Sequence, residues 1–235
     1  MKDKSNANQF ESYCVESYCG LCCKECALRE ANGCQGCAAS KGKPYYGECK
    51  LAQCAISKNR RFCGECGEFP CEMLKSYSYD AKNGDNGNRI ENCKKIKSAL
   101  VKEARKNLDP IGVCGHHCDK CFMGQWCGGC RSDYNCCSFA TLFEDGICPN
   151  VRCAGEKGLD GCYQCVDLEK CSVGFFGNEN QYAAKATSMF IKKHGKSVYT
   201  FSLNNAINSG LKYTEDLDNS GSVTKALELL EKHLT

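Results

Sequence analysis

The fold of this chain is decided by residues 19–71, which read CGLCCKECALREANGCQGCAASKGKPYYGECKLAQCAISKNRRFCGECGEFPC. This stretch contains the first ladder, a series of ten cysteines: Cys19, Cys23, Cys26, Cys34, Cys37, Cys49, Cys54, Cys63, Cys66 and Cys71. A second ladder follows in residues 114–171: Cys114, Cys118, Cys121, Cys127, Cys130, Cys148, Cys153, Cys162, Cys165 and Cys171. Six of the nine gaps between consecutive cysteines are identical in the two ladders. This self-similarity predicts that one structural unit occurs twice in tandem.

The composition predicts a fold that depends on cross-links. Cysteine supplies 25 of the 235 residues. Without cysteine the hydrophobic fraction falls from 42% to about 31%, well below that of an ordinary globular domain. So small an apolar core does not easily offset the entropy of ordering the chain. We therefore expect disulfides or metal ions to hold the structure together.

Metal is favoured over disulfides. The polar segment 1–13 lacks the apolar run of a signal peptide, so we expect a reducing, cytoplasmic compartment in which stable disulfides are rare. The cysteine count is odd, and each ladder contains three CxxC pairs, a spacing that suits a tetrahedral metal ion. No stretch approaches the ~20 apolar residues of a membrane span, and we expect no membrane partner.

The ladders predict four four-cysteine zinc sites, about four Zn²⁺ per chain. In the first ladder the expected sets are Cys23, Cys26, Cys34, Cys37 and Cys49, Cys54, Cys63, Cys66. In the second they are Cys118, Cys121, Cys127, Cys130 and Cys148, Cys153, Cys162, Cys165. The cysteines at the ladder ends (Cys19, Cys71, Cys114 and Cys171) are then surplus, although each is also a candidate to displace an assigned ligand. Four such sites would move the formal charge from +3 to about −5, unlike the basic field of a dedicated nucleic-acid binder.

The remaining cysteines are interpreted as bystanders: Cys14, Cys22, Cys93, Cys136 and Cys137. Cys93 lies on the apolar stripe of an expected helix and is predicted to be a small core residue. Cys22 falls opposite His117 when the ladders are aligned. Because both side chains bind zinc in other contexts, an accessory-ligand role stays open for this pair.

The expected fold class is small α+β: a metal-stabilised tandem repeat with zinc knuckles and short helices, followed by a helical C-terminal module. The predicted domains are residues 1–13 (flexible lead-in), 14–110 (first repeat and linking helix), 111–172 (second repeat) and 173–235 (helical module). Apolar periodicity predicts helices over residues 89–107, 180–194, 196–208 and from 223 onward, with Gly195 as a stop and Ser222 as a cap.

The first ladder resembles an uncharacterised family of Cys-rich proteins, the domain-of-unknown-function family 3795. The likeness lies in CGLCC (19–23), CQGC (34–37), GEC (47–49) through Cys54, and CGECGEFPCE (63–72). The tail from Tyr182 to Gly195 is also similar, and the second ladder departs at DLEKC (167–171). The resemblance implies a zinc-binding domain present in two copies and implies no activity.

The leading functional hypothesis is structural zinc, because closed four-thiolate sites contribute folding free energy rather than catalysis. No catalytic residues are predicted, and whether the protein is an enzyme stays open, with a non-enzymatic scaffold favoured. One alternative is an iron–sulfur protein in anaerobic redox chemistry, since both metals use four-cysteine sets. Another is a module that binds a protein or nucleic acid through Tyr45, Tyr46, Trp126, Arg131 and the Lys94 to Lys106 face. A thiol-redox role through free CxxC pairs is a further alternative.

Overall fold

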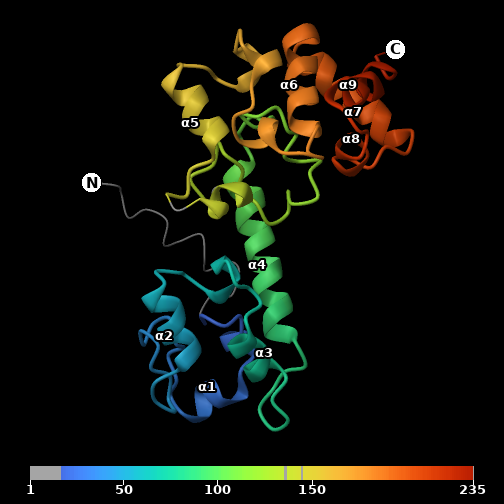
Figure 1. Ribbon diagram of the computed structural model, residues 1–235. Helices are drawn as coiled ribbons and strands as arrows, with labels where there is room; N and C mark the ends of the chain where they lie inside the picture. The colour runs from blue at the N-terminus through green and yellow to red at the C-terminus, as the bar shows by residue number, and fades with distance from the viewer. Residues whose placement is uncertain (1–16, 135–136, 144, 235) are drawn as a thin grey trace. The chain divides into compact units, whose positions relative to one another are not determined.

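The computed structural model describes residues 17–134, 137–143 and 145–234 (Figure 1). The chain forms two compact units that divide between Leu100 and Val101, inside helix α4 (Asn88–Arg105). Each unit is considered by itself. No helix among the described residues is long and apolar enough to cross a membrane.

The first unit consists of short helices, 3-10 turns and the first part of α4. Besides α4 the unit contains α1 (Ala27–Ala31), α2 (Lys50–Ser57), α3 (Glu72–Ser78) and the 3-10 turns η2 (Cys23–Glu25) and η3 (Cys63–Glu65). Its buried apolar side chains include Leu51 of α2, Leu74 of α3 and Phe62 beside η3. Cys93, on the buried stripe of α4, is fully buried, which confirms its prediction as a core residue.

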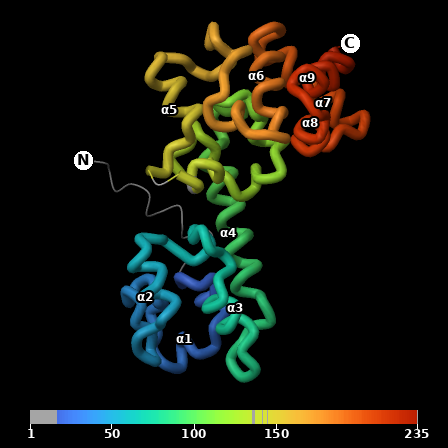
Figure 2. Tube along the Cα trace, viewed as in Figure 1, coloured from blue at the N-terminus to red at the C-terminus, as the bar shows by residue number. Residues whose placement is uncertain are grey.

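The second unit combines turns around the second ladder with a helical tail. The ladder region holds α5 (Pro149–Glu156) and the 3-10 helices η4 (Ser138–Leu142), η5 (Cys162–Gln164), η6 (Leu168–Lys170) and η7 (Gly174–Gly177). The tail comprises α6 (Ala183–His194), α7 (Lys196–Asn208), α8 (Glu215–Asp218) and α9 (Val223–Glu231). In the Cα trace of Figure 2, α6, α7 and α9 gather together, and α6 also contacts η5 and η6.

The tail core explains why these helices form. Phe190 of α6, Tyr199 and Leu203 of α7 and Leu230 of α9 are fully buried in one cluster, which also includes Tyr163 of η5. Gly195 ends α6 with φ +83°, a left-handed conformation that glycine adopts without strain. The Ser222 hydroxyl accepts the Lys225 N–H over 3.2 Å at the start of α9. The predicted stop and cap are therefore confirmed.

The expected α+β fold class is wrong. Among the described residues the regular elements are helices, and the one isolated β-bridge pairs Ile111 with His117. The physical reason lies in the CxxC pairs Cys63–Cys66 and Cys162–Cys165, which occupy the 3-10 turns η3 and η5 rather than β-hairpins. In each turn the N–H of the second cysteine donates to the carbonyl of the first over 3.0 Å, so no strand ladder forms. The expected zinc-knuckle fold is not supported either.

Each ladder begins with a Cys-Gly turn that packs against a helix. Gly20 has φ +85° and its carbonyl accepts a hydrogen bond from Asn92 of α4 over 3.2 Å. Gly115 has φ +88°, and the carbonyl of Cys114 accepts a hydrogen bond from Ser188 of α6 over 2.8 Å. A Cβ at position 20 would lie 2.3 Å from the carbonyl oxygen of Arg89. The close approach of turn and helix therefore requires glycine.

Candidate metal centres

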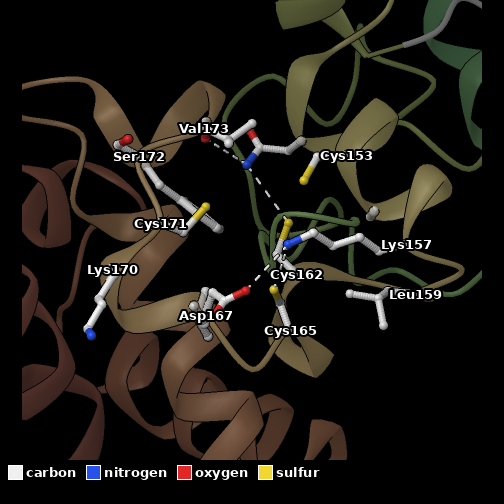
Figure 3. Close-up of a pocket in the computed structure, with 14 residues that line it drawn as sticks. Cys153, Lys157, Leu159, Cys162, Cys165, Asp167, Lys170, Cys171, Ser172 and Val173 are labelled. Carbon is white, nitrogen blue, oxygen red and sulfur yellow. Dashed lines mark hydrogen bonds and ion pairs between the residues drawn. The ribbon is translucent and has the colours of Figure 1, made fainter.

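Each unit contains a pocket lined by cysteines, and each pocket is numbered here after its unit. The second pocket, in the second unit, is lined by four cysteine side chains. Cys153 comes from α5, Cys162 opens η5, Cys165 ends it, and Cys171 follows η6. Figure 3 draws the four sulfurs around this hollow, whose volume is about 270 Å³. Thiols from three successive short elements thus face one space.

The first pocket, in the first unit, has an equivalent lining. Cys54 comes from α2, Cys63 and Cys66 from the turn η3, and Cys71 from the N-terminal cap of α3. The hollow measures about 560 Å³. The corresponding members of both ladders therefore line corresponding pockets.

These groups differ from the sets expected from spacing. Cys71 takes the place expected for Cys49, and Cys171 the place expected for Cys148. Cys49 is the N-terminal cap of α2, and Cys54 lies five residues further on. Five residues turn a helix by about 140° relative to the starting side chain, so the two side chains point in different directions.

Cys49 belongs instead to a group with Cys19 and Cys37. All three are buried. Burial raises the pKa of the Cys37 thiol to about 11, the Tyr18 N–H lowers it, and charges on Cys19 and Cys49 raise it further. The Tyr18 N–H donates to Cys37 Sγ over 3.3 Å. In this hydrogen bond the Cys37 sulfur is the acceptor, which is the role that a metal-bound thiolate also has.

The second ladder has a parallel group of Cys114, Cys130 and Cys148. Burial holds the pKa of Cys114 well above its usual range, and charges on Cys130, Cys148 and Cys118 raise it as well. Burial also raises the pKa of Cys118 to about 12, with Cys130 as the next contribution. The Val113 N–H donates to Cys130 Sγ over 3.2 Å, the same contact that Tyr18 makes with Cys37.

A third set of thiols surrounds Cys127. Its sulfur accepts N–H groups from Ser138 over 3.1 Å and Gly129 over 3.4 Å. A hydrogen bond from Cys137, followed by these donors, lowers the pKa of Cys127 to about 5 although burial opposes the shift. Cys137 was interpreted as a bystander because the first ladder has no cysteine at this place, so spacing gave no signal for its contact with Cys127. The other extra cysteines, Cys14 and Cys136, lie outside the described residues.

The remaining members of the ladders lie around short turns. Cys23 is buried in η2, while Cys26 and Cys34 are half-buried. Burial raises the pKa of Cys121, and a charge on Cys127 raises it further. The structure thus brings Cys121 and Cys127 near each other.

The two candidate accessory ligands, Cys22 and His117, have different surroundings in the two ladders. Cys22 is half-buried at the start of η2. His117 is buried with its ring centroid 6.3 Å from that of Tyr199, and burial lowers its pKa. The neighbouring His116, which sequence reasoning did not select, is the imidazole that reaches a ladder sulfur, with Nδ1 3.7 Å from Cys114 Sγ.

Among residues 17–134, 137–143 and 145–234, no three Cys, His or acidic side chains already converge as a metal-ligand group. The pocket thiols line a hollow, so ligation requires their sulfurs to move inward. Their chemistry nevertheless fits a thiophilic metal, since each pocket offers four sulfur donors. The carboxylates that also line the pockets form ion pairs with lysines: Asp167 with Lys157, Glu68 with Lys58 and Glu72 with Lys75. Donors aimed at Cys37 and Cys130 are the kind of surrounding contact that orients metal ligands.

A lysine accompanies the second cysteine of the CxxC turn in both pockets. Lys157 Nζ lies 3.5 Å from Cys165 Sγ. Lys58 lines the first pocket, where a hydrogen bond to Glu68 and then a charge on Cys66 raise its pKa. These cations would offset part of the negative charge of a thiolate set.

The side chains considered for partner binding have unequal exposure. Tyr45 and Tyr46 are exposed, and their rings meet edge to face at 5.2 Å. Trp126 is half-buried. Arg131 is engaged inside the second unit, where it donates to Asp160 Oδ1 over 2.7 Å and to the carbonyl of Ile111 over 2.8 Å. Arg131 is thus a structural residue in this fold.

Comparison with known proteins identifies a family for part of the chain. Residues 15–76 match the model of the family described as "Protein of unknown function (DUF3795)". This match supports the family for the segment that carries the first ladder. No curated protein and no solved structure matches the chain. The family description assigns no activity.

Proposed function

We propose that this protein binds metal through four-cysteine sites and that the metal, zinc, serves a structural role in a scaffold for a partner or ligand. The observation that carries the proposal is the recurrence of a four-cysteine pocket, Cys54, Cys63, Cys66 and Cys71 in one unit and Cys153, Cys162, Cys165 and Cys171 in the other. All-thiolate zinc sites are closed and contribute directly to folding.

Two further sites complete the proposal. In the second ladder, Cys118 joins the group of Cys114, Cys130 and Cys148, since its charge raises the pKa of Cys114 and a charge on Cys130 raises its own. By alignment, Cys23 joins Cys19, Cys37 and Cys49 in the first ladder. This assignment uses sixteen of the twenty ladder cysteines and gives about four ions per chain.

The arrangement of the two ladders supports tandem duplication. The Cys63 N–H donates to the Tyr18 carbonyl over 2.7 Å, and the Cys162 N–H donates to the Val113 carbonyl over 2.7 Å. Tyr18 and Val113 occupy the same position, directly before the first cysteine of each ladder. We therefore propose that residues 17–76 and 112–172 descend from one unit, the first of which matches the family model.

X-ray absorption spectroscopy of protein purified without added metal tests the proposal. We expect a zinc edge and a first shell of sulfur at about 2.3 Å. A first shell dominated by nitrogen or oxygen, or a metal-free protein, would overturn it.

Iron–sulfur binding is the second candidate, and the hollow between the pocket thiols favours it. Each pocket leaves open space between its sulfurs, about 270 Å³ in the second, which is the arrangement that a multi-atom cluster needs. Anaerobically purified protein with broad visible absorption and an iron edge would select this alternative over zinc. The partner class and the cytoplasmic location expected from the sequence stay predictions.

A further inference from the structure

The side chain of Asn150 lies between two of the proposed sites in the second unit. It is the second residue of α5, is 1% exposed, and lines the second pocket. Its Nδ2 lies 3.8 Å from Cys162 Sγ, and its Oδ1 lies 3.8 Å from Cys148 Sγ. Cys162 belongs to the second pocket and Cys148 to the neighbouring site, so one amide touches both.

Two backbone hydrogen bonds determine which end of the amide faces each sulfur. Asn150 Nδ2 donates to the Val173 carbonyl over 3.0 Å, and Oδ1 accepts the Phe175 N–H over 3.0 Å. Reversing the amide would oppose donor to donor and acceptor to acceptor, so the orientation is determined. Dashed lines in Figure 3 end at Val173 and Cys162, the two groups to which the amide donates.

The segment after the second ladder is shaped around this amide. Gly174, between the two backbone partners, has φ +56°, and a Cβ there would lie 2.2 Å from Asn150 Oδ1. The first unit has no such amide, because the aligned residue, two positions after Cys49, is Leu51. Leu51 is also buried and also lines its pocket. The two units therefore differ in a buried polar contact at one matched position.

The amide presents an N–H donor to the sulfur of Cys162 and an oxygen acceptor to the sulfur of Cys148. An N–H donor stabilises a metal-bound thiolate, whereas an amide oxygen accepts a hydrogen bond from a protonated thiol and repels a thiolate. We propose that Asn150 is a positioning residue whose N–H supports Cys162 Sγ as a metal ligand while its oxygen gives Cys148 Sγ no such support, so the second pocket retains its metal longer than the site containing Cys148. This inference rests on the proposed function and adds an order of metal release.

The test measures how fast each cysteine of the zinc-loaded full chain reacts with N-ethylmaleimide in the presence of EDTA, by peptide mass spectrometry over time. In the unmodified protein we expect Cys162 to react more slowly than Cys148. Asn150→Leu, which installs the residue of the first unit, should bring this ratio about fivefold closer to one, the change expected for one lost hydrogen bond. Asn150→Asp should do the same, because it keeps the acceptor for Phe175 and removes the donor to Cys162.

Two controls separate this role from general destabilisation. The ratio of Cys63 to Cys49 in the same molecule should not change, since Asn150 belongs to the other unit. Ser202→Ala removes a buried hydroxyl that donates to the Leu230 carbonyl over 2.5 Å, away from the pocket, and should leave the Cys162 to Cys148 ratio unchanged. An equal shift in Ser202→Ala, or no shift in the Asn150 variants, would overturn the inference.

A spectroscopic measurement on the unmodified chain covers the case in which neither Asn150 variant folds. In protein loaded with ¹¹³Cd, the Asn150 amide N–H should show scalar coupling to the metal through Cys162. Absence of this coupling in a cadmium-loaded protein overturns the inference and leaves the metal sites standing. A chain that takes up neither zinc nor cadmium overturns the proposed function and the inference together.

Discussion

The backbone N–H of Cys162 donates to the carbonyl oxygen of Val113 over 2.7 Å. Val113 in turn donates its own N–H to Cys130 Sγ. The backbone of one residue at the start of the second ladder thus contacts both proposed sites. The Tyr18 backbone makes the same two contacts with Cys63 and Cys37 in the first unit. Changes at one site should consequently reach its neighbour through a short, well-ordered path.

The grouping of cysteines predicts which substitutions remove metal. Cys71→Ser removes a donor from the first pocket, and the chain should lose about one of its four ions. Cys26→Ser alters a half-buried cysteine outside the proposed sites and should keep all four. Elemental analysis of both variants checks this, and the reverse result would restore the grouping expected from spacing.

Metal removal should unfold much of the protein. A structural zinc site contributes about 10 kcal/mol or more, which is comparable to the whole stability of a typical domain. Chelation under reducing conditions should therefore abolish the cooperative thermal transition monitored by circular dichroism. Added Zn²⁺ should restore it and Mg²⁺ should not, because Mg²⁺ prefers oxygen ligands. An unchanged melting curve after complete metal removal would contradict a structural role.

Replacing glycine by alanine in the Cys-Gly turns should strongly destabilise the fold. Gly20→Ala places a Cβ 2.3 Å from the Arg89 carbonyl oxygen, and Gly115→Ala places one 2.6 Å from Ser188 Oγ. With positive φ as well, each should lower the free energy of unfolding by about 2–4 kcal/mol. Gly155→Ala in α5 meets nothing within 4 Å and should be neutral or stabilising. Unfolding in guanidinium measures the stability of all three variants. Equal effects at positions 20 and 155 would contradict the close packing of the Gly20 turn against α4.

The Asp85–Arg89 pair predicts a pH-dependent contribution in the first unit. Burial alone would raise the pKa of Asp85, but hydrogen bonds from Ser78 over 2.7 Å and Arg89 over 2.8 Å hold it below its usual value. The folded-state pKa therefore lies below the unfolded value of about 3.9. The stabilisation is complete above that value and is lost as pH falls through the folded pKa.

Asp85→Asn tests this sign directly. It should lower the free energy of unfolding by about 1.5–3 kcal/mol near pH 7, because Arg89, only 7% exposed, loses its charged partner. The difference from the unmodified chain should stay constant down to about pH 5 and shrink below about pH 4. Comparing the two proteins at each pH cancels any shared effect of metal loss, and a difference that grows on acidification would be inconsistent with the pair.

Much of the helical structure could be predicted from residue periodicity. The segment expected over residues 196–208 is α7, the expected stop of α6 agrees with Gly195, and the expected start of α9 agrees with Ser222. The start of α6 lies at Ala183, three residues after the expected position. These helices could be predicted because each repeats an apolar stripe and carries a local end signal.

The cysteine groups could be predicted only in part. Spacing identified Cys63–Cys66 and Cys162–Cys165 as pairs, but it did not reveal that α2 directs Cys49 away from Cys54. The β component of the expected fold was wrong because CxxC spacing is equally compatible with a 3-10 turn. Asn150 had no signal in its own spacing, since only three-dimensional packing brings it near Cys162.

Native mass spectrometry of the freshly purified chain tests the central claim most directly, because it counts ions on the folded protein. The account predicts a dominant species with four zinc ions that shifts to the mass of the bare 25.9 kDa polypeptide after acid denaturation. A folded chain that carries no metal under the same gentle conditions would contradict the account.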